Sequence, residues 1–234
     1  MRPLNASAKY FLVQKLRLSN KEAAALIVAG RFLLNGQPAQ LNQPLKPEDE
    51  VTLDGKILKE AQQFHYLAYY KPRGIETTLN EAIPDNLVQA LSFPERVFPI
   101  GRLDRESEGL LLLTNDGSIF DRILHSEQKQ EKEYVVRVDK PLTADVILAM
   151  ASGVEIMGKK TRPAQVKQLD DFTFNIILTQ GLNRQIRRMC YKLGYEVLEL
   201  KRIRIVQVEL GDLQVGEWRE LGKEDVEMFK RLPK

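Results

Sequence analysis

The order of strand-like and helical segments between residues 64 and 210 most constrains the fold of this chain. Strand-like stretches recur there, with helical patterns between them in an irregular order. A regular strand–helix–strand repeat would favour a parallel sheet, whereas this order favours an α+β domain with a largely antiparallel mixed β-sheet and flanking helices. The expected strands are 64–70, 110–114, 133–138, 172–178, 196–200 and 203–210, and the expected helices are 85–91, 118–124, 144–151 and 183–193.

The N-terminal part has the pattern of a small module with its own fold. Ser19 and Glu22 have the spacing of a capping box, which predicts a helix through AAALIVA that ends at Gly30. An Asn-Gly pair and an Asp-Gly pair farther along mark two tight hairpin turns. We therefore expect one domain over 1–59 and a second over 60–234.

Charge is distributed unevenly between these two parts. The chain has 35 Lys+Arg and 32 Asp+Glu, which gives a formal net charge of +3. Nine basic and five acidic residues fall within 1–59, so this part carries +4 and the remainder −1. A small cationic module on a near-neutral body suggests that the module binds a polyanion, although a solvated surface with an accidental imbalance would look the same.

The most informative stretch is FPIGRLDRESEG, which LLLLTNDG follows. A glycine turn brings Arg102 and Asp104 into a loop, and the apolar run 110–114 predicts a buried strand that anchors this loop. Catalytic groups are often positioned in this way, on a loop held by a rigid element. Taken alone, however, an aspartate in such a loop is more often a cap or a turn residue.

Several motifs together resemble the RsuA/RluB/RluE/RluF family of RNA pseudouridine synthases. They are KPRG at 71–74, GRLDRESEGLLLLTNDG at 101–117, EKEYVVRVDKP at 131–141 and QGLNRQIRRMC at 180–190. The last two look closest to the RluF branch, which acts on 23S rRNA. Residues 4–58 resemble the S4 RNA-binding domain. The resemblance implies an S4-like RNA-binding domain followed by a pseudouridine synthase domain.

This resemblance also implies a reaction. Uridine in 23S ribosomal RNA would be isomerised to pseudouridine: the C1′–N1 bond breaks, the uracil turns, and C5 bonds to C1′. No cofactor is consumed. By resemblance Asp104 is the essential carboxylate, which either attacks C1′ or removes the C2′ proton. The sequence leaves both routes open.

An ionised carboxylate in a closed pocket needs a cation within about 4–6 Å, because burial alone raises its pKa. A helical projection of 183–193 places Arg187 at the flank of an apolar stripe, where it would be partly buried. The resemblance independently implies that Arg187 pairs with Asp104. The stripe consists of Ile186, Met189, Cys190 and Leu193, and the opposite side carries Arg184, Arg188 and Lys192.

The resemblance assigns further roles around the target base. Tyr134 would take the C5 proton, although its place in an expected strand also suits a core tyrosine. Leu200 would pack under the uracil, and Arg102 would fill the space of the flipped base or bind its phosphate. Lys71 belongs to the first motif and is a further expected substrate contact. Phosphate contacts are expected from the basic run 184–204, in particular from Arg184, Arg188 and Arg202.

Several classes of function are disfavoured by what the sequence lacks. A single cysteine, Cys190, rules out an intrachain disulfide, and with only His65 and His125 it forms no zinc-binding pattern. The sequence contains neither a Walker loop, which binds nucleotide phosphates, nor the dinucleotide-binding motif G-x-G-x-x-G. The longest apolar runs are far shorter than a membrane span, and the first ten residues lack the apolar core of a signal peptide.

We therefore expect a cytoplasmic enzyme that binds ribosomal RNA, with no cofactor, no metal and no membrane partner, and we expect it to be a monomer. Two alternatives stay open at this point. One is a pseudouridine synthase that acts on 16S rRNA or on a tRNA anticodon arm. The other is an RNA-binding assembly factor that has kept the fold and lost the activity.

Overall fold

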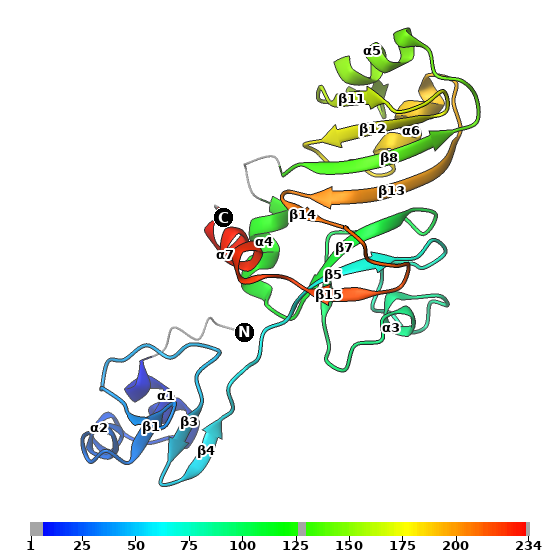
Figure 1. Cartoon of the computed structure of the whole chain (residues 1–234). Coiled ribbons are helices and arrows are strands. Elements are labelled where there is room, and N and C mark those ends of the chain that lie inside the picture. The colour runs from blue at the N-terminus through cyan, green and yellow to red at the C-terminus, as the bar shows by residue number, and fades with distance from the viewer. Residues whose placement is uncertain (1–6, 126–129, 233–234) are drawn as a thin grey trace. The chain divides into compact units, whose positions relative to one another are not determined.

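The computed structural model describes residues 7–125 and 130–232. The chain forms two compact units, Met1–Phe64 and His65–Lys234 (Figure 1). The expected boundary after residue 59 lies five residues before the end of the first unit. Within the described residues, no helix has the length and apolar character needed to cross a membrane.

Local sequence signals account for the first unit. Its elements are α1 (Ala8–Leu16), α2 (Asn20–Val28), β1 (Phe32–Leu34), β2 (Gln37–Pro38), β3 (Val51–Leu53) and β4 (Lys56–Lys59). The Ser19 hydroxyl accepts the Glu22 amide at 3.3 Å and the Glu22 carboxylate accepts the Ser19 amide at 2.8 Å, so the capping box is confirmed. Asn35 and Gly36 have φ of 51° and 77°, as a tight β1–β2 turn requires. The sheet order is β2-β1-β3-β4, antiparallel throughout.

A nine-stranded mixed sheet forms the centre of the second unit. Its main path runs β11-β12-β8-β13-β7-β5-β15, and only the β13–β7 pair is parallel, which confirms the expected largely antiparallel sheet. The strands on this path are β5 (Tyr66–Lys71), β7 (Glu108–Thr114), β8 (Lys132–Val138), β11 (Gln165–Gln168), β12 (Thr173–Leu178), β13 (Val197–Ile205) and β15 (Trp218–Glu220). Strand β6 (Phe98–Ile100) pairs with β7, β14 (Val208–Glu209) pairs with β13, and β9 (Glu155–Ile156) with β10 (Lys159–Lys160) forms a separate hairpin.

The helices of this unit cover the two halves of the sheet. They are α3 (Leu87–Ala90), α4 (Gly117–His125), α5 (Ala144–Ser152), α6 (Gln185–Lys192) and α7 (Lys223–Arg231). Helices α5 and α6 pack on β8, β12 and β13 in one apolar cluster. On β5 and β7, alternate residues face two further clusters, one with α4 and α7 and the other with α3. Tyr134 contacts both the α6 cluster and the α3 cluster, so it lies where these two cores meet.

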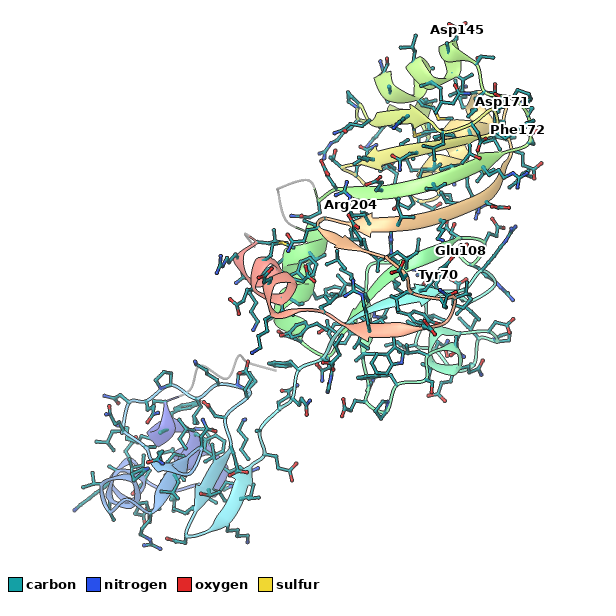
Figure 2. The ribbon with its side chains drawn as sticks, in the orientation of Figure 1. Tyr70, Glu108, Asp145, Asp171, Phe172 and Arg204 are labelled. Carbon is teal, nitrogen blue, oxygen red and sulfur yellow. The ribbon has the colours of Figure 1, made fainter. Side chains whose placement is uncertain are left out.

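Strand β13 departs from the sequence-based expectation of two strands, 196–200 and 203–210. It continues without a break through the basic residues Lys201, Arg202 and Arg204 and ends at Ile205. Cross-strand contacts explain how charged residues stay in a central strand. Arg204, which is labelled on β13 in Figure 2, donates to Glu133 of β8 at 2.7 Å and to Glu131 at 3.1 Å. The charge of Arg204 is therefore neutralised by two carboxylates that lie more than 70 residues away in sequence, and the local sequence does not reveal them.

A row of four residues crosses the centre of the sheet. Lys71 on β5 is paired with Gly109 on β7, Gly109 with Arg202 on β13, and Arg202 with Tyr134 on β8. A Cβ atom at Gly109 would lie 2.2 Å from the Arg202 carbonyl oxygen, and φ there is +105°. Only glycine permits β7 and β13 to approach so closely at this point. The loop that precedes β7 is therefore joined directly to β13.

Candidate active site

The Asp104 side chain lies on the loop between β6 and β7. Leu103, which precedes it, is buried, and its amide and carbonyl both bond to the Thr77 hydroxyl, at 3.3 and 2.7 Å. The Ser107 amide donates to the Asp104 carbonyl at 3.0 Å, and the Gly74 amide donates to the Arg105 carbonyl at 2.7 Å. These bonds fix the backbone on both sides of Asp104, whose own side chain is half-buried. The expected mounting of a carboxylate on a firmly held loop is present.

Arg187 projects from α6 toward this loop, as the apolar stripe of the helix predicts. Ile186, Met189 and Cys190 are buried, and the Arg187 side chain at their flank is 12% exposed. Its guanidinium donates to the Glu106 carbonyl at 3.0 Å and to the Val197 carbonyl at 3.1 Å. The Arg187 guanidinium thus ties the Asp104 loop to α6 and to the start of β13.

The charge partner of Arg187 differs from the expected one. Its Nε lies 3.7 Å from the Glu106 carboxylate, which also accepts from Arg184 at 2.9 Å. Among the residues that the structure describes, Asp104 forms no ion pair within 4.0 Å. Asp104 is still close enough to act on Arg187 electrostatically: burial lowers the pKa of Arg187, and the charges of Glu106 and Asp104 oppose that change. The hydrogen bond from Arg184 lowers the pKa of Glu106.

Glu106 is the functional candidate that sequence reasoning missed. Its neighbours in sequence do not mark it, because both arginines that it meets lie about 80 residues farther along the chain. The available signal was an acidic residue two positions after Asp104 together with a cluster of arginines at 184–188.

Lys71 and Arg202 lie behind the loop, and this corrects the expectation that they contact the substrate. Lys71 is 0% exposed, and its Nζ donates to the Pro72 and Ile75 carbonyls at 2.7 Å each. Burial lowers the pKa of Lys71 to about 8, against the opposing attraction of nearby carboxylates that include Asp104. Arg202 is 3% exposed and donates to the Leu110 carbonyl at 2.7 Å and the Arg102 carbonyl at 3.5 Å. Arg202 thus supports the Asp104 loop from the interior, whereas Lys71 holds the neighbouring segment 72–75, whose Gly74 amide bonds to the Arg105 carbonyl.

The remaining predicted residues occupy three different environments. Tyr134 is half-buried, in the row that contains Gly109 and Arg202. Leu200 is buried among the residues that contact α6. Arg102 is exposed, pairs with Glu76 at 2.8 Å and lines a hollow of about 760 Å³.

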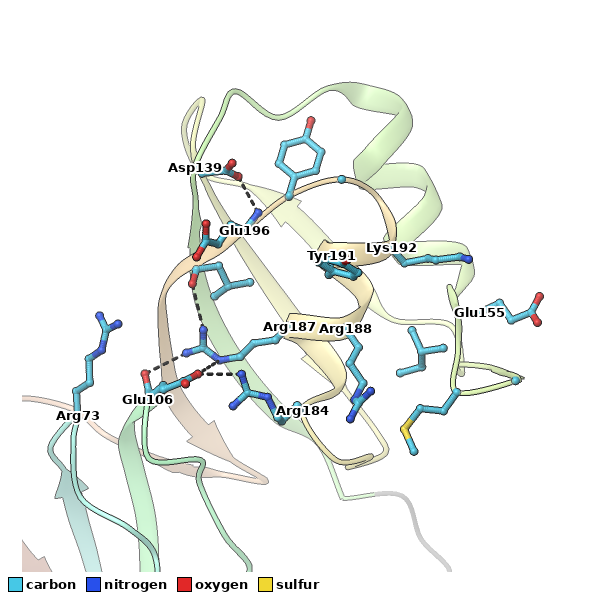
Figure 3. A pocket seen from close by; sticks show the side chains of 16 residues that line it. Arg73, Glu106, Asp139, Glu155, Arg184, Arg187, Arg188, Tyr191, Lys192 and Glu196 are labelled. Carbon is cyan, nitrogen blue, oxygen red and sulfur yellow. Dashed lines mark hydrogen bonds and ion pairs between the residues drawn. The ribbon is translucent and has the colours of Figure 1, made fainter. Parts of the chain in front are cut away.

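A second hollow, of about 1080 Å³, adjoins the Asp104 loop and extends across α6 (Figure 3). Glu106 and Arg187 belong to its wall, whereas Asp104, Tyr134 and Leu200 do not line it. The predicted residues Arg184 and Arg188 line it as well, and Arg188 is exposed and donates to the Asn183 carbonyl at 3.0 Å. The structure thus brings Arg184, Arg187 and Arg188 together beside the loop.

The described residues offer no ready metal site. Within 7–125 and 130–232, no group of three His, Cys, Asp or Glu side chains is arranged to hold a metal ion. Two cations, Lys71 and Arg187, are instead near enough to Asp104 to interact with its charge. Such a site favours a carboxylate that acts directly on a bound substrate, close to groups that stabilise negative charge.

Comparison with known proteins shows which family this chain belongs to. The profile of the family described as RNA pseudouridylate synthase matches residues 65–192, and that of the S4 domain matches residues 10–51. The chain is 44% identical over 217 residues to the dual-specificity RNA pseudouridine synthase RluF of Escherichia coli (strain K12), covering 92% of this chain and 75% of the relative. It is 30% identical over 223 residues to the ribosomal large subunit pseudouridine synthase B of Bacillus subtilis (strain 168), covering 92% of this chain and 91% of the relative.

A solved structure agrees with these matches. A crystal structure of a pseudouridylate synthase superposes with a TM-score of 0.66 at 28% identity, covering 96% of this chain and 99% of the other. The expected family, the S4 domain and the α+β fold are therefore confirmed. The chain belongs to the RNA pseudouridine synthase family and is an isomerase with an S4 domain in front of its synthase domain.

Proposed function

We propose that this protein converts a uridine of 23S ribosomal RNA to pseudouridine, with Asp104 as the catalytic carboxylate. The observation that carries the proposal is the half-buried Asp104, which no described residue engages in an ion pair, on a loop whose backbone is bonded on both sides. A carboxylate kept free of partners and held in place is available to react with a bound nucleoside.

The reaction is an isomerisation, so its atoms balance without a further reactant. The C1′–N1 bond of uridine breaks, the uracil rotates, and a C5–C1′ bond forms; C5 then loses a proton and N1 gains one. Asp104 either attacks C1′ or removes the C2′ proton. We assign the removal of the C5 proton to Tyr134, which lies where the two cores meet and in the same row across the sheet as Gly109, with β13 between them.

Arg187 supports Asp104 in two ways in this proposal. Its hydrogen bonds to the Glu106 carbonyl and the Val197 carbonyl hold the loop against α6 and β13. Its guanidinium is also near enough to Asp104 for the two opposite charges to interact. Leu200 would form the apolar floor under the uracil, and Arg102 would contact the RNA from which the base has been turned out.

The identity of the RNA rests on the relatives. The Bacillus subtilis relative is named for the large ribosomal subunit, which supports 23S rRNA as the substrate of this chain. The Escherichia coli relative is named as dual-specific, which favours a second RNA, and a tRNA anticodon arm is our candidate. We also propose that the protein works in the cytoplasm, where its single, buried Cys190 would stay reduced.

Mapping of pseudouridines tests this proposal. Ribosomal and transfer RNA from cells with and without the gene are compared at single-nucleotide resolution, and we expect at least one 23S site to lose its pseudouridine. The gene for wild-type protein should restore that site, and the gene for Asp104→Asn should not. A changed site only in 16S rRNA or tRNA contradicts the 23S assignment. Restoration by Asp104→Asn, produced at the wild-type level, contradicts the role of the carboxylate.

A further inference from the structure

Three exposed side chains on α6, those of Arg188, Tyr191 and Lys192, are required by neither the loop nor the fold. Arg184, Arg188 and Lys192 follow one another at intervals of four residues, and Arg187 and Tyr191 form a second row with the same interval. Residues four apart are neighbours on a helix surface. Tyr191 is 83% exposed, and Arg188 and Lys192 beside it are exposed too. We call these five residues the α6 face.

The α6 face does not stabilise the helix. Like charges four residues apart repel, and an exposed aromatic ring contributes little packing. Glu106 neutralises Arg184 and Arg187, whereas Arg188 and Lys192 have no acidic partner within 4.0 Å among the described residues. Lys192 stands in the last turn, where a cation is favourable for the helix dipole, but this does not explain Arg188 or Tyr191.

The surroundings of the α6 face connect it to the proposed active site. The hollow of about 1080 Å³ begins at Glu106 and Arg187, passes over Tyr191 and ends at the β9–β10 hairpin, where Met157 is 66% exposed (Figure 3). Of the other acids in its wall, Asp139 and Glu196 lie together near the start of β13, and Glu155 lies on the hairpin. The cations are thus concentrated along α6, and the acids lie at the margins.

We infer that the α6 face binds an unpaired nucleotide of the substrate RNA next to the target uridine, with its base stacked on Tyr191 and its phosphates beside Arg188 and Lys192. Proteins bind single strands by combining a cationic groove with exposed aromatic rings. A base within a duplex could not stack on Tyr191, because its faces are covered by the neighbouring base pairs. The inference rests on the proposed function, since it specifies the form of the RNA beside the reacting base.

Binding measurements with the full chain test the stacking contact. The probe is a 12-nucleotide single-stranded RNA of mixed sequence, and a duplex of the same sequence serves as comparison. Tyr191→Ala should weaken binding of the single strand by about 5- to 100-fold, and Tyr191→Phe should stay within about twofold of wild type because it keeps the ring. Binding of the duplex should not change. Leu148→Ala, which removes an exposed apolar side chain from α5, is the matched control and should bind as wild type.

Salt dependence separates the base contact from the phosphate contacts. The double variant Arg188→Met/Lys192→Met should lower the slope of log affinity against log salt by about 1.4, since each phosphate contact of a single strand contributes about 0.7. Tyr191→Ala should leave that slope unchanged. A lower slope in Tyr191→Ala, or an unchanged slope in the double variant, contradicts the assignment.

A local readout avoids interference from RNA bound elsewhere on the chain. In Tyr191→Trp, binding of the single strand should quench the added indole emission, whereas the wild-type chain, whose only tryptophan is Trp218, should not show this quenching. Normal binding by Tyr191→Ala together with no quenching in Tyr191→Trp overturns the inference. Neither experiment needs turnover, so an inactive chain that still binds through Tyr191 would refute the proposed function alone.

Discussion

At the scale of single residues, Asp104 and Glu106 show how two carboxylates of one loop come to differ. Glu106 meets Arg184 and Arg187, which lower its pKa, whereas Asp104 has no cation within 4.0 Å among the described residues. The Glu106 backbone carbonyl accepts from Arg187, whose guanidinium is near enough to Asp104 for their charges to interact. A direct Asp104–Arg187 ion pair would have kept the carboxylate occupied.

Arg187 and Arg188 are neighbours with different expected roles, so substitutions at the two positions should change different kinetic constants. Arg187→Met keeps much of the aliphatic volume but removes the bonds to the loop, so we expect kcat to fall on the order of 100-fold. Arg188→Met removes an exposed cation and should mainly raise KM. Single-turnover rates at saturating RNA measure the difference, and circular dichroism checks that both variants are folded.

The pH profile of Arg187→Met then distinguishes positioning from ionisation. Since Arg187 bonds to the loop backbone rather than to the Asp104 carboxylate, the loss should be similar between pH 6 and 9. A rate that recovers at high pH would show that Arg187 acts chiefly by keeping Asp104 ionised. A normal single-turnover rate in Arg187→Met would refute both roles.

Lys71 gives the folded state a pH dependence. Its pKa is about 8 when buried and 10.5 ordinarily, so between these values the unfolded chain holds a proton that the folded chain has released. Stability therefore rises with pH from this residue, starting near pH 8. Burial also lowers the pKa of Lys132 to about 8, which contributes a similar rise.

Lys71→Met should accordingly reduce the increase in the free energy of unfolding between pH 7.5 and 9 by about half. Urea unfolding at several pH values measures this increase. Lys192→Met removes an exposed lysine and serves as control, with the wild-type increase expected. An unaltered increase in Lys71→Met would mean that Lys71 keeps its ordinary titration in the fold.

At the scale of elements, the parallel pairing of β7 with β13 decides where the Asp104 loop lies. The two strands approach at Gly109, next to the end of the loop, and Arg202 of β13 bonds to carbonyls on both sides of it. Because β13 also pairs with β8, this contact brings Tyr134 into the same row. The active-site geometry thus depends on one close approach of two backbones.

Gly109→Ala should disrupt that approach. The added Cβ would meet the Arg202 backbone at 2.2 Å, and the positive φ adds strain, so we expect a loss of about 2 kcal/mol or more in unfolding free energy. Gly117→Ala is the matched control, because a Cβ there meets nothing within 4 Å and alanine favours the first turn of α4. Equal stability of the two variants in urea would contradict the proposed constraint.

At the scale of the whole molecule, the two units have separate apolar cores. The first is built around Leu12, Phe32 and Val51, and none of its members belongs to the clusters of the second unit. We therefore expect separate roles, in which the second unit holds the proposed catalytic loop and the cationic first unit contributes affinity for RNA.

Deletion of Met1–Phe64 tests this division. The remaining unit should still unfold cooperatively, but its affinity for ribosomal RNA should fall, and the slope of log affinity against log salt should decrease by about 0.9 for each phosphate contact of a duplex segment that is lost. Thermal unfolding and binding at several salt concentrations are the two measurements. An unchanged slope would show that the first unit makes no phosphate contacts.

Features that depend on near neighbours follow from the local sequence. The capping box needs only Ser19 and Glu22, the β1–β2 turn needs Asn35 and Gly36, and the burial pattern of α6 follows from its apolar spacing. These interactions span a few residues, so the local pattern contains all the information that they require. The family motifs likewise pointed to the RNA pseudouridine synthases before any tertiary contact was known.

By contrast, the burial of charged residues and the contacts between them depend on the arrangement of distant segments. Arg202 was expected at the RNA surface, yet its bond to the Leu110 carbonyl, 92 residues away in sequence, holds it inside the sheet. Lys71 is buried where β5 pairs with β7 at Gly109, and Glu106 meets arginines that lie about 80 residues away in sequence. The free energy of burying a charge depends on partners that strand pairing supplies, and no local pattern contains the register of distant strands.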